Sequence, residues 1–353
     1  MARGEISQIF DALEKIDNSV TKKDVRGECW DLRITCAYRI FRAFDIPRFR
    51  LEPANPKGVL DDLLELVNYI EDFPRIDDDL RSLQGNRTGP SSRQDGVELM
   101  QYLYGLAWSQ LTREQYFDAT ELFARRLYNS NIDISFLRGA ECLDLGTGIA
   151  RYALAMVQLG ARHVVGIDFS MECLEEAKRR LEGSREGQHI NLVHGDLYNL
   201  PDTQSQVFDF VCANGVIHHL PDPTRGLEVV FNCTRKGGKA FVFVFSKSDS
   251  PWWRSIDLMR SLAGPVPLAY AHKILRFYEV PGSKIFNMLD YSYTPIQHRF
   301  DRRWFERAVE SIGFKGVQLL EGGVIHDSVL RCKLFEADRE LYGITEIRYL
   351  MEK

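Results

Sequence analysis

The residues best suited to chemistry in this chain gather around one short segment that contains two glycines. Residues 141–151 have the sequence ECLDLGTGIAR, in which an apolar run ends at Gly146 and Gly148 and a helical pattern follows. Glycine lets the backbone turn sharply and approach a ligand closely. The first N–H groups of the following helix favour a carboxylate or a phosphate. The segment therefore predicts a ligand-binding turn.

An acidic residue completes this candidate site. Asp168 lies 24 residues after Asp144, at the end of the next apolar run, in the sequence GIDFS. A carboxylate in this place can accept hydrogen bonds from both hydroxyls of a ribose. An acid that ends an otherwise buried strand has little structural reason to be there. The two segments together predict a site for a cofactor that contains a nucleoside.

The residue at position 151 separates two kinds of cofactor. The dinucleotide fingerprint G-x-G-x-x-G requires glycine there, whereas this chain has Arg151 after Ala150. With Asp144 two residues before the first glycine, the pattern is D-x-G-x-G-x-A. It resembles the first motif, D/E-x-G-x-G-x-G, of the class I S-adenosylmethionine-dependent methyltransferases. Thr147 stands where many members have cysteine, and Ala150 stands where glycine is usual. Because both residues are small, we expect the loop to keep its conformation.

Later segments extend the resemblance in the order and spacing of that family. They are HGDL at 194–197, FDFVCAN at 208–214, HHLPD at 218–222 and RKGG at 235–238. The resemblance covers roughly residues 138–246 and, less specifically, residues 295–336. The small-molecule enzymes of the quinone-methylase type are the most similar members. It implies S-adenosylmethionine as the cofactor.

The resemblance also implies which residues would hold the methionine end of the cofactor. Gly146 and Gly148 would line it, and Asp144 would contact its amino group directly or through water. Asn214 would offer its backbone carbonyl near the sulfonium. Asp144 has an alternative role as a cap of its own loop, because aspartate commonly accepts hydrogen bonds from nearby backbone N–H groups.

At the adenosine end, the resemblance implies that Asp168 holds the ribose diol and Phe169 packs on the adenine. Asp196 would accept a hydrogen bond from the adenine amino group, with Leu197 on the ring face. Two alternatives stay open at this point. Asp196 could cap its own turn, and Phe169 could be an ordinary core residue.

The implied reaction is an in-line displacement of a methyl group from the sulfonium onto a small-molecule acceptor. Proximity and the exclusion of water would do most of the work. A general base is needed only if the acceptor carries a proton that must leave. His218 and His219 follow the fourth predicted strand and are the candidates, with a structural role in the loop as the alternative. No histidine spacing indicates a metal site.

Two other functions remain open. The chain could use the same cofactor without methylation, by cyclisation or by aminocarboxypropyl chemistry that releases methylthioadenosine. It could also be a non-catalytic cofactor-binding partner whose helical N-terminal region docks a second subunit. Product analysis with the cofactor alone, and then with an acceptor, separates these alternatives.

The elements that must position these residues are of two kinds. Helical periodicity predicts helices at 31–44, 58–73, 97–108 and 113–128, with residues 85–96 as a loop rich in Gly, Pro and Ser. From about residue 138, short apolar runs alternate with helical patterns, which is typical of βαβ units.

We therefore expect an α/β fold with a doubly wound, mostly parallel seven-stranded sheet, as in the Rossmann-like methyltransferase fold. The last two strands are expected in KGVQLLEG and SVLRCKLFEA, and their short connection allows only antiparallel pairing. This places one reversed strand at the far edge of the sheet.

Four regions are expected along the chain. Residues 1–129 would be a helical cap or dimerisation region, which makes a homodimer one expectation, and residues 130–246 the cofactor-binding core. Residues 247–300 would be an inserted substrate cap and residues 301–353 the completion of the sheet. The aromatic residues of the insertion would form an apolar acceptor pocket or the core of a lid. Its basic residues favour an anionic acceptor, with a solvated face as the alternative.

Composition limits the class of protein further. The 353 residues carry 45 Lys+Arg and 50 Asp+Glu, a net charge of −5, so no global electrostatic attraction to nucleic acid is expected. No apolar segment is long enough to span a membrane, and the first residues do not resemble a secretory signal. Seven scattered cysteines without a C-x-x-C pair suit reduced thiols. We therefore expect a cytoplasmic protein.

Overall fold

The computed structural model describes residues 2–24, 29–45, 54–72, 112–128, 130–200, 207–320 and 336–353. The chain divides into two compact units. The first, the helical unit, comprises Met1–Leu99, Ser248–Thr294 and Cys332–Gly343. The second, the sheet unit, comprises Met100–Lys247, Pro295–Arg331 and Ile344–Lys353.

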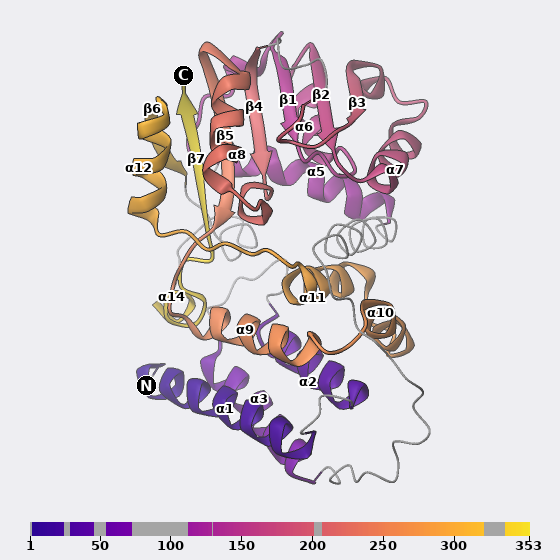
Figure 1. Ribbon diagram of the computed structural model, residues 1–353, viewed down its shortest axis with the longest axis vertical. Helices are drawn as coiled ribbons and strands as arrows, with labels where there is room; N and C mark the ends of the chain where they lie inside the picture. The colour runs from indigo at the N-terminus through magenta and orange to yellow at the C-terminus, as the bar shows by residue number, and fades with distance from the viewer. Residues whose placement is uncertain are drawn as a thin grey trace. The chain divides into compact units, whose positions relative to one another are not determined.

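The sheet unit is built on seven strands (Figure 1). They are β1 (Glu141–Leu145), β2 (His163–Asp168), β3 (Ile190–His194), β4 (Phe208–Asn214), β5 (Thr234–Phe245), β6 (Lys315–Leu320) and β7 (Glu346–Glu352). Their order in the sheet is β3-β2-β1-β4-β5-β7-β6. The strands from β3 to β5 pair in parallel. The predicted doubly wound α/β sheet is confirmed.

The reversed strand differs from the prediction. β7 runs antiparallel to β5 and to β6, and it lies between them. The prediction was wrong to place the reversed strand at the edge and to draw it from SVLRCKLFEA. Most of that segment lies outside the described residues, and its last two residues, Glu336 and Ala337, begin α14 (Glu336–Tyr342). The connection from β6 to β7 is long, so no short hairpin imposed the pairing.

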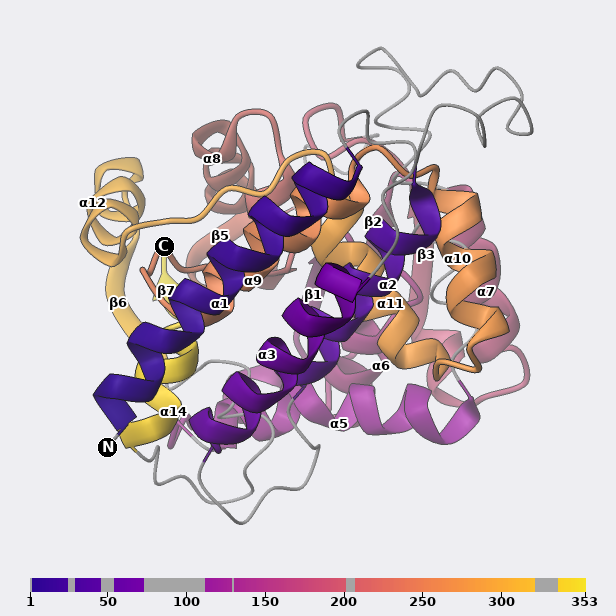
Figure 2. The same ribbon diagram turned by 90° about the horizontal axis from the view of Figure 1, so that it is seen from below.

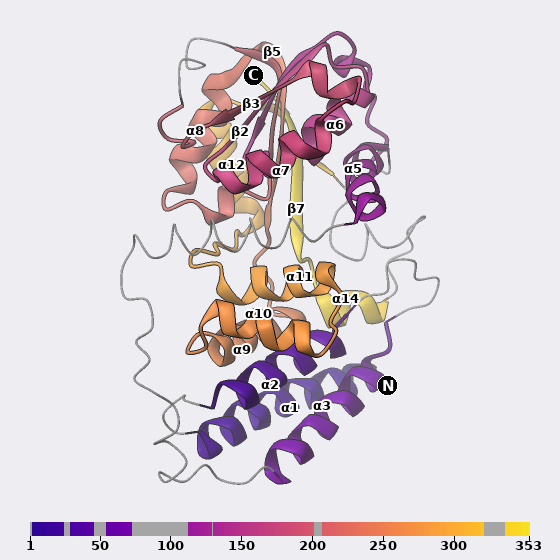
Figure 3. The same cartoon turned by 90° about the vertical axis from the view of Figure 1, so that its right-hand side faces the viewer.

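Helices cover both faces of the sheet (Figure 3). On one face lie α8 (Pro223–Cys233) and α12 (Arg302–Ile312), whose apolar residues join a core with β4, β5 and β7. On the other lie α5 (Arg113–Tyr128) and α6 (Arg151–Gln158), with Phe123 of α5 against Phe210 and Phe241. The helix α7 (Met171–Leu181) follows β2. Because side chains alternate along a strand, Phe210 and Asn214 share the face that α5 covers.

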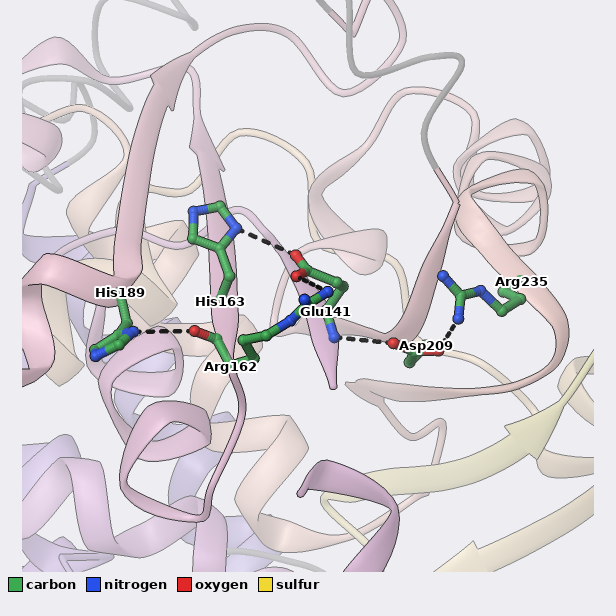
Figure 4. A network of polar contacts seen from close by, with 6 residues as sticks. All are labelled: Glu141, Arg162, His163, His189, Asp209 and Arg235. Carbon is green, nitrogen blue, oxygen red and sulfur yellow. Dashed lines mark hydrogen bonds and ion pairs between the residues drawn. The ribbon is translucent and has the colours of Figure 1, made fainter. Parts of the chain in front are cut away.

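The amino ends of the central strands are held by a polar network (Figure 4). Glu141 pairs with Arg162 at 2.6 Å and lies 3.4 Å from His163. Its backbone N–H donates to Asp209, which also pairs with Arg235. These polar groups hold the amino ends of the strands together. They lie at the opposite edge of the sheet from the glycine turn, and His163 belongs to this network.

The helical unit contains α1 (Ala2–Lys23), α2 (Trp30–Ala43), α3 (Pro56–Asp72), α9 (Pro251–Ala263), α10 (Leu268–Phe277), α11 (Gly282–Tyr293) and α14. Figure 2 shows α1 alongside α3. Two helices predicted from periodicity, at 31–44 and 58–73, appear as α2 and α3. The predicted helix at 97–108 and the loop at 85–96 lie outside the described residues.

The two tryptophans of the insertion serve as core, whereas Phe277 and Tyr278 are exposed. Trp252 and Trp253 are buried, and Trp252 packs against Phe44, Tyr291 and Tyr342 within the helical unit. Arg260 donates to the carbonyls of Tyr291 and Thr294, so it ties the end of α11 to α9. These contacts give Trp252 and Arg260 structural roles within the helical unit.

Candidate functional site

The turn after β1 has the backbone conformation that its glycines predicted. Gly146 has φ +67° and Gly148 has φ +54°, both in the left-handed region. A Cβ on Gly146 would also collide with the side chain of Val216, which follows β4. Glycine is therefore required at position 146 for two reasons, the left-handed backbone angle and the close approach of the loop that follows β4.

Ala150, just before α6, shows why glycine is usual there in the resembling family. It has φ +63° and lies in the left-handed region, where a Cβ is unfavourable. The loop is intact, as expected, but it contains a strained alanine at the N-cap of α6.

Asp168 joins the end of β2 to this turn. Its Oδ2 accepts from the N–H of Gly148 at 2.7 Å and its Oδ1 from the N–H of Ser170 at 2.9 Å. The side chain is 7% exposed, and burial raises the pKa of its carboxyl while these backbone donors lower it. A carboxylate has about four lone-pair positions, so acceptor capacity remains for a ligand.

Asp144 lies beneath the same turn. It is 1% exposed, and Oδ2 accepts from the hydroxyl of Thr147 at 2.7 Å. Burial raises the pKa of Asp144 to about 7, and the hydrogen bond from Thr147 opposes this rise. Asp144 therefore holds Thr147 of its own loop through a side-chain hydrogen bond, and it is also placed to interact with a cation near the turn.

The helix α5 reaches the turn from its outer side. The hydroxyl of Tyr116 donates to the carbonyl of Ile149 at 3.2 Å, and the Arg180 guanidinium lies 5.0 Å from the Tyr116 ring centroid. Both Tyr116 and Ile149 are buried. This contact fixes the carbonyl between Gly148 and the strained Ala150, so α5 helps to hold the turn.

At the expected adenosine end, the predicted residues lie in two loops. Phe169 follows Asp168, and its carbonyl accepts from His194 at 3.0 Å. Leu197 is buried in the core beside β4. Asp196 is exposed, and its Oδ1 accepts from the N–H of Tyr198 at 2.9 Å, so it caps its own turn as the alternative predicted.

Asn214, the last residue of β4, is fixed by Arg126 of α5, a residue that sequence reasoning overlooked. Nη1 of Arg126 donates to Oδ1 of Asn214 at 2.7 Å and to the hydroxyl of Tyr152 at 2.5 Å. Arg126 is 6% exposed. Its helix carries buried residues at three- and four-residue intervals: Tyr116, Thr120, Phe123, Arg126 and Leu127. The sequence signal that could have identified Arg126 is an arginine at a position of the buried, otherwise mostly apolar face of this helix.

The two histidines after β4 lie in a short 3-10 turn, Ile217–His219. His218 is 1% exposed and stacks on Phe245, with ring centroids 3.9 Å apart. Burial lowers its pKa well below the usual value, and its Nδ1 has no hydrogen-bond partner among the described residues. Nδ1 of His219 lies 2.8 Å from the carbonyl of Ile296. Both histidines thus make contacts that hold the loop in place.

Comparison with known proteins identifies one part of the chain. Residues 143–242 match the model of a methyltransferase domain family. This part of the chain is therefore a methyltransferase domain. This match contains the end of β1, the glycine turn, Asp168, Asn214 and most of β5, so it coincides with the site described above.

Two curated relatives are methyltransferases of the predicted quinone type. One, "Ubiquinone biosynthesis O-methyltransferase" of Idiomarina loihiensis, is 29% identical over 154 residues, which are 44% of this chain and 61% of the relative. Another, "Demethylmenaquinone methyltransferase" of Clavibacter sepedonicus, is 31% identical over 128 residues, 36% and 50% respectively. The chain thus spans between half and two thirds of the length of these relatives.

Among solved structures, an S-adenosylmethionine-dependent methyltransferase of Thermotoga maritima has a TM-score of 0.43 at 15% identity. That comparison covers 72% of this chain and 99% of the other. No described helix of the chain combines the length and apolarity needed to cross a membrane.

The family implies S-adenosylmethionine as cofactor, and the residues of the turn fit it. Gly146 and Gly148 hold the turn in left-handed conformations, which suits a backbone that lies close against a ligand. The buried carboxylate of Asp168 keeps acceptor capacity beyond its two backbone donors. Asp144 supplies a second buried acid, as a ligand with an ammonium group and a sulfonium requires.

Proposed function

We propose that this protein transfers a methyl group from S-adenosylmethionine to a small-molecule acceptor by in-line displacement. The single observation that carries the proposal is the hydrogen bond from Gly148 to Asp168, which brings the glycine turn and the ribose-binding acid together at the carboxyl ends of β1 and β2. The quinone-related names of the curated relatives support a small acceptor.

The bound cofactor would supply an activated methyl group on a good leaving group. The chain's own residues would then bind and orient the reactants. We place the ribose diol on Asp168 with Phe169 beside the adenine, the amino group near Asp144, and the sulfonium near the backbone carbonyl of Asn214. Gly146 and Gly148 would line the methionine part.

Asp196 and Leu197 would complete the adenine end. Asp196 already caps a turn, but a carboxylate can accept from a ligand as well as from its own backbone. The roles of all these residues rest on matching motif positions and on the placement of the turn, so each is a target for substitution.

The general-base role of His218 and His219 is also a proposal. The lowered pKa of His218 keeps its ring neutral at physiological pH, which is the form that accepts a proton. An acceptor that reacts without losing a proton would need neither residue. Replacement of each histidine by glutamine distinguishes a base from a packing residue, because only loss of a base changes the pH dependence of kcat.

Product analysis tests the proposed reaction. The protein is incubated with S-adenosylmethionine, first alone and then with a library of small phenols, acids and amines. S-adenosylhomocysteine formed only with an acceptor supports methylation. Methylthioadenosine formed without an acceptor would instead support cyclisation or aminocarboxypropyl chemistry. Cofactor binding with no product from any acceptor would favour a non-catalytic partner subunit.

A further inference from the structure

We infer that Arg180 of α7 is a positioning residue for cofactor binding, which acts through the ring of Tyr116 on the peptide bond before Ala150. The inference rests on the proposed function and deepens it, because it gives a residue outside the glycine motif a part in holding the turn that receives the cofactor. The relevant contacts all lie within the sheet unit.

One peptide unit carries both the strain of the turn and its contact with α5. Ala150 has φ +63°, where a Cβ is unfavourable. The carbonyl of the same peptide unit belongs to Ile149, and it accepts the hydrogen bond from the hydroxyl of Tyr116 at 3.2 Å. Because a peptide unit is planar, a hydrogen bond that fixes its carbonyl also restricts φ of the residue that follows. Tyr116 therefore acts directly on the strained conformation.

The phenol of Tyr116 is itself held by a cation. Burial raises the pKa of Tyr116 to about 12, with the charges of Arg151 and Arg180 opposing the rise, so the hydroxyl keeps the proton that it donates. Cζ of Arg180 lies 5.0 Å from the Tyr116 ring centroid, within the range in which a cation is attracted to an aromatic face. Since Arg180 belongs to α7, this contact ties the ring to that helix.

A buried acid fixes Arg180 in turn. Oε1 of Glu176, one helical turn earlier on α7, accepts from Nε of Arg180 at 2.6 Å, and the two side chains are 5% and 15% exposed. A pair with so little exposure is only weakly screened by salt and water. Arg179 also pairs with Glu176, but its side chain is 69% exposed. Arg179 therefore offers a matched control for Arg180.

The segment from the end of β2 through α7 thus holds the turn at two neighbouring points. Asp168 accepts from the N–H of Gly148, and α7 begins three residues later, at Met171. Arg180, in the last turn of α7, acts through Tyr116 on the next carbonyl. A ligand that needs one conformation binds more weakly when fewer molecules adopt it. Loss of Arg180 should therefore weaken cofactor binding without removing a group that contacts the cofactor.

Calorimetry of S-adenosylhomocysteine binding tests the inference. Arg180→Gln should bind this ligand at least about threefold more weakly than the natural protein. Arg180→Lys keeps a cation for the ring and should retain most of the affinity. Arg179→Gln removes only the exposed partner of Glu176 and should leave the affinity unchanged. An unchanged affinity in Arg180→Gln, or an equal loss in Arg179→Gln, overturns the inference.

The Ala150→Gly substitution distinguishes positioning of the turn from a general loss of structure. Glycine adopts the left-handed angle without penalty, so the turn should no longer need Arg180. Arg180→Gln combined with Ala150→Gly should bind within about twofold of Ala150→Gly alone. A loss that persists undiminished in that background contradicts the assignment. If Arg180→Gln does not fold, Tyr116→Leu takes its place in the same comparison, with the same expectation.

The proposed function fails separately. If the natural protein does not bind S-adenosylhomocysteine, the proposed function is wrong, and hydrogen exchange of the Gly148 amide in the absence of ligand then decides the inference. That amide donates to Asp168, and its exchange should be faster in Arg180→Gln and slowed again when Ala150→Gly is added. The same exchange rate in all of these proteins would contradict the inference.

Discussion

The carboxylate of Asp168 accepts a hydrogen bond from the backbone N–H of Gly148 across 2.7 Å, and this bond joins the end of β2 to the turn that follows β1. A second bond from Ser170 fixes the other carboxylate oxygen. The acid is thus aligned before any ligand arrives, which reduces the ordering cost of binding.

The close approach of Val216 to Gly146 predicts a large effect of one methyl group. Gly146→Ala should lower the free energy of unfolding and abolish measurable cofactor affinity, because the Cβ meets both an unfavourable φ and a neighbouring side chain. Gly139→Ala is the matched control, with φ +71° and open space around its Cβ. The control should cost only about 1–2 kcal/mol and retain cofactor binding. Similar losses in both variants would contradict the role of the contact.

The strained alanine before α6 predicts a stabilising substitution. Ala150→Gly should raise the free energy of unfolding by roughly 1 kcal/mol, since glycine adopts φ +63° without penalty. Chemical denaturation of both proteins measures the difference. A destabilised variant would show that the turn does not hold the left-handed conformation.

Burial of Asp144 predicts a pH-dependent stability. Its pKa is raised to about 7 in the folded state, so the folded protein binds this proton more tightly than the unfolded chain. The stability that it contributes is complete below the unfolded pKa and is lost as the pH rises through 7. Asp144→Asn should therefore gain stability relative to the natural protein between pH 5 and 8. Melting temperatures across this range test it, and a constant difference would refute the raised pKa.

The contact between Tyr116 and Ile149 predicts that α5 supports cofactor binding. Tyr116→Phe removes one hydrogen bond to the turn and should cost about 1 kcal/mol, seen as a several-fold weaker affinity for S-adenosylhomocysteine. Phe117→Tyr, at an exposed neighbouring position, is the control. An unchanged affinity in Tyr116→Phe would mean that the turn holds its conformation without this helix.

Much of the sheet and of the turn could be predicted because the relevant signals are local. The glycines of the turn and the acid at the end of the next strand are short-range patterns, and the helix at 113–128 was predicted with its observed bounds. The strand Glu346–Glu352 was missed because buried Glu346 and Arg348 give it a polar pattern. Their mutual ion pair, two residues apart, compensates for that polarity.

The remaining site residues depend on contacts across the fold. Arg126 meets Asn214 only because α5 packs over β4 and β5, and no spacing in the sequence encodes that contact. The place of the reversed strand was wrong for a similar reason. A short connection was expected before the reversed strand, whereas the chain passes through α14 before it returns as β7.

Calorimetry of S-adenosylhomocysteine binding to Asp168→Asn tests the central claim most directly. The account predicts at least about tenfold weaker affinity, because the ribose loses a charged hydrogen-bond acceptor. Asp209→Asn changes an acid of the same sheet at its opposite edge and should bind as tightly as the natural protein. Undiminished affinity in a correctly folded Asp168→Asn protein would contradict the account.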